Sequence, residues 1–271
     1  MASAPPAANS KPVLWSLDQR GIGTVTLNRP ERNNAYNDAL IGGLLAAMDA
    51  LGAEAGLRAV VLKGNGRHFQ AGADLAWING VRTAGADANR VASQATAEAV
   101  DRLNRLPVPT VALVQGGCFG GGTGVIAACD MVIAADNAIF SIAEVRWGLT
   151  AAIIIPQLCD AMSVRQVRRY ALTGERFDAE EARRTGLVHK VVPLAELDAA
   201  GEAAVAAILD NAPVAIAETK ACILRHAHGA FDRATFAALV DEHAKKRQTD
   251  EAAEGLASFI EKRAASWTPK R

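Results

Sequence analysis

The sequence lacks the features that mark several large classes of protein. Its 29 basic and 29 acidic side chains give a formal net charge of zero, so there is no global basic field of the kind that holds nucleic acid. No apolar run approaches the roughly 18 residues that a membrane-spanning helix requires. Residues 1–12 have neither a basic nor an apolar leader region, which predicts a disordered tail and not a signal peptide. We therefore expect a cytoplasmic protein without nucleic-acid or membrane partners.

Cysteine and histidine are scarce and scattered along the chain. The four cysteines have neither metal-ligand spacing nor a dense disulfide pattern: Cys118, Cys129, Cys159 and Cys222. Reduced thiols and no metal site are the expectation. Cys118 lies beside a glycine-rich segment and could be a nucleophile, but no histidine lies near it in the sequence, which favours packing. His68 and His189 show no ligand spacing and are interpreted as surface or packing residues.

What the sequence does contain is a glycine-rich segment that ends at Gly124. It reads Pro109-Thr-Val-Ala-Leu-Val-Gln-Gly-Gly-Cys-Phe-Gly-Gly-Gly-Thr-Gly124 and predicts a strand that delivers bare backbone N–H groups to a helix. A second small-residue turn, Ala71-Gly-Ala-Asp74, opens another helix, and Glu144 follows further on. Two backbone donors and one carboxylate can hold an enolate oxygen and move a proton. Tight packing is the alternative interpretation of each glycine turn.

The remaining pattern predicts a layered α/β fold. Strands are expected at 13–17, 22–28, 57–63, 110–115, 131–135 and 139–141, in a repeated ββα rhythm that favours a parallel sheet. Asn37 and Asp38 are expected to cap a helix that runs to about residue 51. Residues 80–99 form a polar, alanine-rich stretch, expected to be mobile near a pocket mouth, before a helix that ends at Arg105.

Beyond residue 164 the pattern predicts helices and too little strand to extend the sheet. The expected helices span 164–173, 178–185, 194–211, 213–227, 231–247 and 250–264. We accordingly divide the chain into the tail 1–12, a core over 13–205 and a C-terminal helical region over 206–271.

In their order along the chain these motifs resemble the crotonase (enoyl-CoA hydratase/isomerase) superfamily. The matching stretches, from first to last, are Val25-Thr-Leu-Asn-Arg-Pro30 with Asn34-Ala35, Ala59-Val-Val-Leu-Lys-Gly64, Ala71-Gly-Ala-Asp74, Phe119-Gly-Gly-Gly122, Cys129-Asp130, Leu172-Thr-Gly-Glu-Arg176, Ala182 with Gly186-Leu-Val188, and Phe259-Ile-Glu-Lys-Arg263. The resemblance implies an α/β spiral of repeated ββα units. It also implies a C-terminal helical region through which subunits associate as a homotrimer or a dimer of trimers.

The resemblance assigns a role to three residues at the expected reaction centre. The N–H groups of Ala73 and Gly121 match the family's two oxyanion donors, and Glu144 matches the second of the two catalytic glutamates of hydratases. The apolar residues before Glu144 would bury it and raise its pKa toward a useful range. A solvated or ion-paired carboxylate is the alternative.

The resemblance also implies a binding site for the coenzyme A part of the substrate. The residues concerned are Arg29 and Arg32 near the phosphates, Ala71 at the adenine amino group, Asp74 beside it, and Phe259 and Lys262 reaching a neighbouring subunit's coenzyme A. For Arg29 and Arg32, ordinary surface solvation is the alternative.

Two departures from the family pattern point to a subfamily. Hydratases with two glutamates carry the other carboxylate at the position of Gly124, where this chain has no side chain; the space would suit a branched acyl group. The segment from Glu144 to Pro156 resembles hydratases of methylglutaconyl-CoA and isohexenylglutaconyl-CoA, whose substrates carry a second carboxylate. Arg146 is a candidate to bind that carboxylate, with a structural ion pair as the alternative.

The resemblance therefore implies a lyase that hydrates a 3-branched glutaconyl-type enoyl-CoA in isoprenoid or leucine catabolism, without a metal or redox cofactor. Within enzymes, the alternatives are a general enoyl-CoA hydratase and a Δ3-Δ2-enoyl-CoA isomerase, because one carboxylate suffices for a proton shift. From another class, a non-catalytic acyl-CoA-binding or RNA-binding member of the fold is the alternative. Neutral charge weighs against RNA, and the presence of Glu144 weighs against an inactive protein.

Overall fold

A six-stranded sheet forms the centre of the computed structural model, which describes residues 11–227 and 249–269 together with 234, 239, 240, 243, 245 and 246. In spatial order its strands are β1 (Val13–Leu17), β2 (Ile22–Leu27), β3 (Ala59–Gly64), β4 (Thr110–Val114), β6 (Met131–Ala135) and β9 (Lys190–Val192). β1 and β2 are antiparallel, and every later neighbour is parallel. The expected hairpin and parallel sheet are confirmed.

A smaller sheet lies beside the first and explains the ββα rhythm. It contains β5 (Gly117–Phe119), β7 (Ile139–Ser141) and β8 (Phe177–Asp178). The chain passes from β4 in the large sheet to β5 in the small one, and again from β6 to β7. An isolated bridge between Gln70 and Cys118 brings the chain after β3 to the same small sheet. The turns that follow β3 and β5 are thereby held next to each other.

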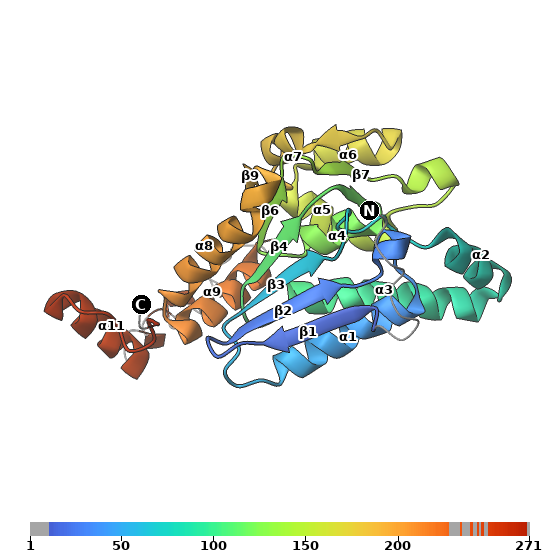
Figure 1. Ribbon diagram of the computed structural model, residues 1–271. Coiled ribbons are helices and arrows are strands. Elements are labelled where there is room, and N and C mark those ends of the chain that lie inside the picture. Colours follow the sequence, from blue (N-terminus) through green and yellow to red (C-terminus); the bar gives the residue numbers. More distant parts are fainter. Residues whose placement is uncertain are drawn as a thin grey trace.

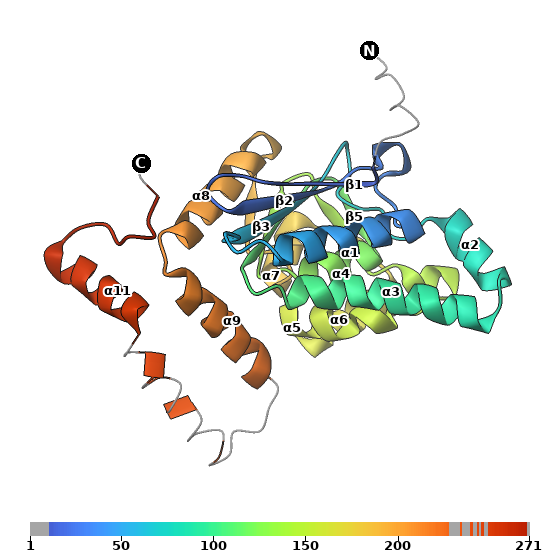
Figure 2. The same cartoon turned by 90° about the horizontal axis from the view of Figure 1, so that it is seen from below.

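Helices cover both faces of the large sheet (Figures 1 and 2). α1 (Asp38–Gly52), α3 (Ala86–Asn104) and α4 (Gly121–Ala127) share one core with alternate strand residues such as Val60 and Leu62. α8 (Leu197–Leu209) packs on the opposite face with the intervening residues, such as Ala59 and Val61. Both faces are apolar because successive strand residues point to opposite sides and each side is covered.

The beginning of α1 follows its sequence signal, whereas the next helices do not. Asn37 caps α1 by accepting a hydrogen bond from the backbone of Leu40 at 3.1 Å, as predicted. Residues 80–99, expected to form a mobile stretch before a helix, are instead mostly helical. α2 (Leu75–Thr83) runs into this stretch, and α3 begins already at Ala86. Buried residues on one side of α3, among them Thr96 and Val100, supply the packing that its polar composition concealed.

The second half of the chain contains more strand than expected. α6 (Val164–Thr173), α7 (Ala179–Thr185), α9 (Pro213–His226) and α11 (Asp250–Glu261) follow the expected helices closely, whereas α5 (Ile155–Ala161) was not expected. The expectation that too little strand remains to extend the sheet is wrong, because β9 pairs with β6 and β8 pairs with β7. Strands of two or three residues give too short an alternation to detect.

The division of the chain into a tail, a core and a C-terminal helical region stays a prediction. Its boundary after residue 205 lies within α8, whose residues 208 and 209 belong to the buried core. Residues 1–10 of the expected tail 1–12, and most of the helix expected at 231–247, lie outside the described residues.

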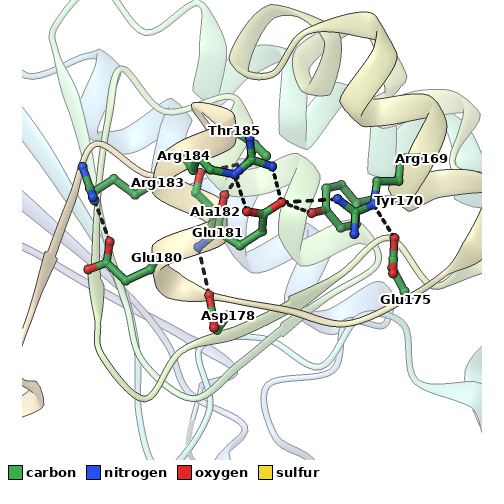
Figure 3. A network of polar contacts seen from close by, with 10 residues as sticks. All are labelled: Arg169, Tyr170, Glu175, Asp178, Glu180, Glu181, Ala182, Arg183, Arg184 and Thr185. Atoms are coloured by element: carbon green, nitrogen blue, oxygen red, sulfur yellow. Dashed lines mark hydrogen bonds and ion pairs between the residues drawn. The ribbon is translucent and has the colours of Figure 1, made fainter.

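A network of polar contacts joins α6 to α7 (Figure 3). Glu181 accepts a hydrogen bond from the hydroxyl of Tyr170 and forms an ion pair with Arg184 at 2.5 Å. The bonds from Arg184 and Tyr170 lower the pKa of Glu181 to about 2.

Gly174, at the end of α6, accepts hydrogen bonds from Ser141 at 2.9 Å and from Arg146 at 2.8 Å. The carbonyl of Gly174 thereby supports η2 (Glu144–Trp147), the 3-10 turn that carries Glu144.

Among the described residues, no single helix is long and apolar enough to cross a membrane. The helices Leu194–Leu209 and Pro213–His226 are long and apolar enough only when taken together, and the chain bends by 101° between them.

All four cysteines are free thiols, and Cys118 is buried, as its interpretation as a packing residue predicts. His68 and His189 each accept a backbone hydrogen bond at Nδ1, from Gly117 and Val132 respectively.

Candidate functional site

The glycine turn between β5 and α4 is shaped by close neighbours. Gly120 adopts a φ of 51°, in the left-handed region that favours glycine, and its N–H donates to the carbonyl of Ser141 at 2.8 Å. A Cβ on Gly121 would lie 2.6 Å from Cε1 of Tyr36, and one on Gly122 would lie 3.0 Å from the carbonyl of Gln70. Side chains are excluded at these positions. The Gly121 N–H donates to no other described protein group.

The second small-residue turn leaves another backbone N–H available. Tyr36 donates its N–H to Gly72 at 2.8 Å and accepts from the N–H of Asp74 at 2.9 Å. The two hydrogen bonds of this parallel bridge use the carbonyl of Gly72 and the N–H of Asp74, which lie on either side of Ala73. Within the described part of the chain, the Ala73 N–H therefore also donates to no protein acceptor. Each of the two turns thus presents a free backbone N–H at the residue for which the sequence predicted a donor.

An ion pair fixes the turn that contains Ala73. Asp74 caps α2 through a hydrogen bond from the backbone of Ala76 at 3.1 Å, and it pairs with Arg29 at 3.2 Å. Arg29 also donates to the carbonyl of Ala35 at 2.5 Å. Burial raises the pKa of Asp74, but the hydrogen bonds from Arg29 and from backbone N–H groups outweigh it, so the pKa lies below its usual value.

Glu144 projects over the glycine turn. A Cβ built on Gly120 would lie 3.1 Å from Oε1 of Glu144. Oε2 is buried and has no hydrogen-bond partner among the described residues. Burial raises the pKa of Glu144 above its usual value of 4.5, because the low-dielectric surroundings disfavour the charged form. A carboxyl group with a raised pKa and an unused oxygen can take up and release a proton.

Ala73, Gly121 and Glu144 share one cavity of about 470 Å³. Its walls come from α2, the middle of α3, the glycine turn and the segment around Ala152–Ile154 (η3). Tyr36 and Trp77 form an edge-to-face pair in one wall, with ring centroids 5.6 Å apart. Two charged residues, Glu144 and Arg82, are among its lining residues. The cavity is thus a mainly apolar chamber with two free N–H groups and one buried carboxyl group.

Ala71 also lines this cavity, but the two residues predicted to meet the acyl group do not, and both predictions need correction. Gly124 gives no space to an acyl group, because a Cβ there would lie 2.1 Å from Cγ2 of Ile154. Ile154 occupies that space and itself lines the cavity. Arg146 donates to the carbonyl of Gly174 and is absent from the cavity wall, so it supports η2 and does not meet a substrate carboxylate.

The residues expected to bind coenzyme A lie at several places. The Arg29 side chain is only 15% exposed and is held by Asp74, whereas Arg32 is exposed at the end of η1 (Pro30–Arg32). Phe259 and Lys262 lie at the end of α11, at the opposite side of the molecule from α2 (Figures 1 and 2). Their expected contacts need a second copy of the chain and stay predictions, as does the role of Arg29 and Arg32 at the phosphates.

Tyr36, Trp77 and Arg82 are among the wall residues that escaped the sequence interpretation. Tyr36 follows the motif residues Asn34 and Ala35. Its aromatic side chain, directly before the residue that caps α1, is the one signal in the sequence that could have identified it. Trp77 and Arg82 both lie on α2, in a segment whose composition is ordinary for a helix. Their place in the wall depends on contacts with residues distant in the sequence.

Such a cavity in an α/β fold has the groups that could polarise a carbonyl group and move a proton beside it. The comparisons agree. The profile of the enoyl-CoA hydratase/isomerase family matches residues 18–270. The chain belongs to this family and has the crotonase fold, which makes it an enzyme of the enoyl-CoA hydratase/isomerase type that acts on acyl-CoA substrates.

Individual relatives extend over nearly the whole chain. A Thermus thermophilus protein assigned as an enoyl-CoA hydratase is 36% identical over 251 residues, which cover 92% of this chain and 98% of its own. The mevalonyl-coenzyme A hydratase sidH of Aspergillus fumigatus is 31% identical over 266 residues, 95% of each chain. The structure of Pseudomonas aeruginosa AtuE matches with a TM-score of 0.91 and 34% identity, and covers 95% of this chain and 100% of that one.

Proposed function

We propose that the chain is a lyase that adds water across the α,β double bond of an enoyl-CoA thioester. The observation that carries the proposal is the buried Glu144 carboxyl group, with one unbonded oxygen, in the same cavity as the free N–H groups of Ala73 and Gly121. In this reaction the thioester oxygen accepts hydrogen bonds from both N–H groups. Charge that develops on this oxygen is then stabilised by donors already in position.

Glu144 serves as the acid and base in this mechanism. A water molecule attacks Cβ and gives a proton to Glu144 as its oxygen bonds to carbon. The electron pair of the double bond moves toward the thioester oxygen, which forms an enolate. Glu144 then returns the proton to Cα and the neutral thioester is restored. The raised pKa of Glu144 suits both transfers. No electron is gained or lost and the N–H donors carry the oxyanion charge, so the proposed reaction needs neither a redox cofactor nor a metal.

The proposed substrate is a 3-branched glutaconyl-type thioester, such as a methylglutaconyl or isohexenylglutaconyl group. Arg82 supports the second carboxylate of this class, because it is the cation among the described lining residues of a mainly apolar cavity. Its Nε and Nη2 donate to Asn79 at 3.2 and 3.1 Å, which leaves further N–H groups for a carboxylate. Arg82 thus takes the role that the sequence assigned to Arg146.

An isomerase that shifts a Δ3 double bond to Δ2 is the second candidate. The reason is the lack of a carboxylate at Gly124, since a proton shift between Cα and Cγ needs a single acid and base. A general enoyl-CoA hydratase differs from our proposal only in the substrate. The relative named as a mevalonyl-coenzyme A hydratase lends support to hydration.

A panel of acyl-CoA thioesters tests the proposal. Hydration removes the absorbance of a conjugated enoyl thioester, whereas isomerisation of a Δ3 substrate creates it. We expect hydration, fastest with glutaconyl-type substrates. Arg82→Gln should lower kcat/KM for these by roughly tenfold or more. It should leave kcat/KM unchanged for linear acyl-CoA substrates that have no second carboxylate. Arg90→Gln, at an exposed position of α3, is the matched control. Isomerisation without hydration would disprove the lyase, and equal rates for both substrate types would disprove the second carboxylate.

A further inference from the structure

Tyr36 places a hydroxyl group beside the reaction centre. Its ring lies against Gly121, where a Cβ would be 2.6 Å from Cε1 and 3.4 Å from the hydroxyl oxygen. The ring also packs edge-on against Trp77 at an interplanar angle of 68°. These two contacts hold the phenol in the cavity wall, next to the backbone that offers the Gly121 N–H.

Tyr36 and Glu144 line the same cavity. Glu144 sits over Gly120, and Tyr36 sits over the adjacent Gly121. Burial and, next, the charge of Glu144 raise the pKa of Tyr36 to about 12, so the phenol keeps its proton at neutral pH. Tyr36 is half-buried, and its hydroxyl forms no hydrogen bond to any other residue that the structure describes, so the O–H is available to a ligand in the cavity.

We propose that the Tyr36 hydroxyl is a further catalytic residue, which holds the attacking water molecule together with Glu144. This inference rests on the proposed hydration. The water donates one O–H to Glu144 and accepts a hydrogen bond from Tyr36, which directs its remaining lone pair at Cβ. During attack the water proton passes to Glu144, and Tyr36 keeps its own. Tyr36 thus supplies the second polar anchor that Gly124 cannot provide.

Two reactions separate this role from others. Hydration needs a positioned water, whereas exchange of the α-proton of a saturated acyl-CoA with solvent deuterium needs only Glu144 and the two N–H donors. Tyr36→Phe removes the hydroxyl and keeps the ring. We expect it to lower kcat for hydration on the order of 10–100-fold, as for a misplaced reactant, with KM and the exchange rate unchanged.

The chain offers a matched control in its other tyrosine. Tyr170→Phe removes a hydroxyl that bonds Glu181, away from the cavity, and should leave both reactions at wild-type rates. Circular dichroism establishes that each variant is folded. The proposal is overturned if Tyr36→Phe hydrates normally, or if hydration and exchange fall together, which would place the hydroxyl at the thioester oxygen. A wild-type enzyme that exchanges protons but hydrates no substrate refutes the proposed function itself.

Discussion

Gly124 shows how one residue can mislead an interpretation from sequence. The absence of a side chain is real, but the space that it leaves is filled by Ile154, whose Cγ2 and Cβ would lie 2.1 and 2.4 Å from a Cβ on Gly124. The glycine therefore permits close contact between α4 and η3 and does not enlarge the substrate cavity. Gly124 therefore acts in packing. It affects the cavity only because it allows Ile154 to lie in the cavity wall.

We expect Gly124→Ala to destabilise the protein by roughly 1–3 kcal/mol, because an added methyl in a tight core forces backbone movement. Urea unfolding followed by circular dichroism measures this change. Gly42→Ala in α1 is the matched control, since nothing lies within 4 Å of its Cβ; there helix propensity should stabilise the protein by about 0.5–1 kcal/mol. Equal effects of the two substitutions would contradict the packing role.

At the level of single residues, the sequence predicted backbone N–H groups and a carboxyl group that stand in a recognisable order of motifs. Ala73, Gly121 and Glu144 do meet in one cavity. Tyr36 and Arg82 were missed because their positions depend on which distant residues face them. Arg146 was misassigned because its partner, the carbonyl of Gly174, is brought near by the folding of α6.

Among the elements, the turn at the beginning of α2 invites a test because it holds the Ala73 N–H. Asp74 both caps α2 and pairs with Arg29. Asp74→Ala should cost roughly 1–2 kcal/mol of stability, as for a lost cap, and should also lower kcat. Asp178→Ala removes a comparable cap from α7, where Asp178 accepts from Glu181, and should cost stability alone. A normal kcat in Asp74→Ala would show that the turn needs no such anchor.

The same pair predicts a pH dependence. The folded pKa of Asp74 lies below its usual value of 3.8, so the unfolded chain binds this proton more readily than the folded one. The pair therefore stabilises the fold fully above pH 3.8 and loses its effect as the pH falls through the lower, folded pKa. The difference in unfolding free energy between wild type and Asp74→Asn should shrink over that interval. A difference that stays constant down to the acid limit would contradict this.

Elements with a long, regular pattern were predicted well, as α1 and the parallel strands show. The short strands β8 and β9 were missed, because two or three residues carry no readable period. α3 was partly missed because its polar composition conceals a narrow buried side. In each case the tertiary contact, and not the local sequence, determined the structure.

The molecule as a whole carries apolar surface on its C-terminal helices. Ile223 on α9 and Leu256, Phe259 and Ile260 on α11 are exposed, with Phe259 at 85%. Surfaces of this kind mark interfaces between proteins. The homotrimer or dimer of trimers stays a prediction, in which Phe259 and Lys262 would contact a neighbour's coenzyme A.

We predict that sedimentation will show a trimer or hexamer and that Ile260→Asp will shift it to monomer. Coenzyme A should raise the thermal unfolding midpoint of the wild type, while the free acid should not, because most expected contacts are to the nucleotide and thioester. The monomeric variant should lose much of this protection. Val91→Asp, at an exposed apolar position on α3, serves as the control. Full protection of a monomer by coenzyme A would contradict a shared binding site.

The central claim is that Glu144 is the acid and base of the reaction. Its most direct test is Glu144→Gln, an isosteric change that leaves the Ala73 and Gly121 donors in place. Hydration and α-proton exchange are measured together with the dissociation constant of a saturated acyl-CoA. We predict that kcat falls on the order of 10²–10⁴-fold, that exchange falls with it, and that binding is nearly unchanged. Hydration near the wild-type rate in this variant would show that another group moves the proton and that the mechanism is wrong.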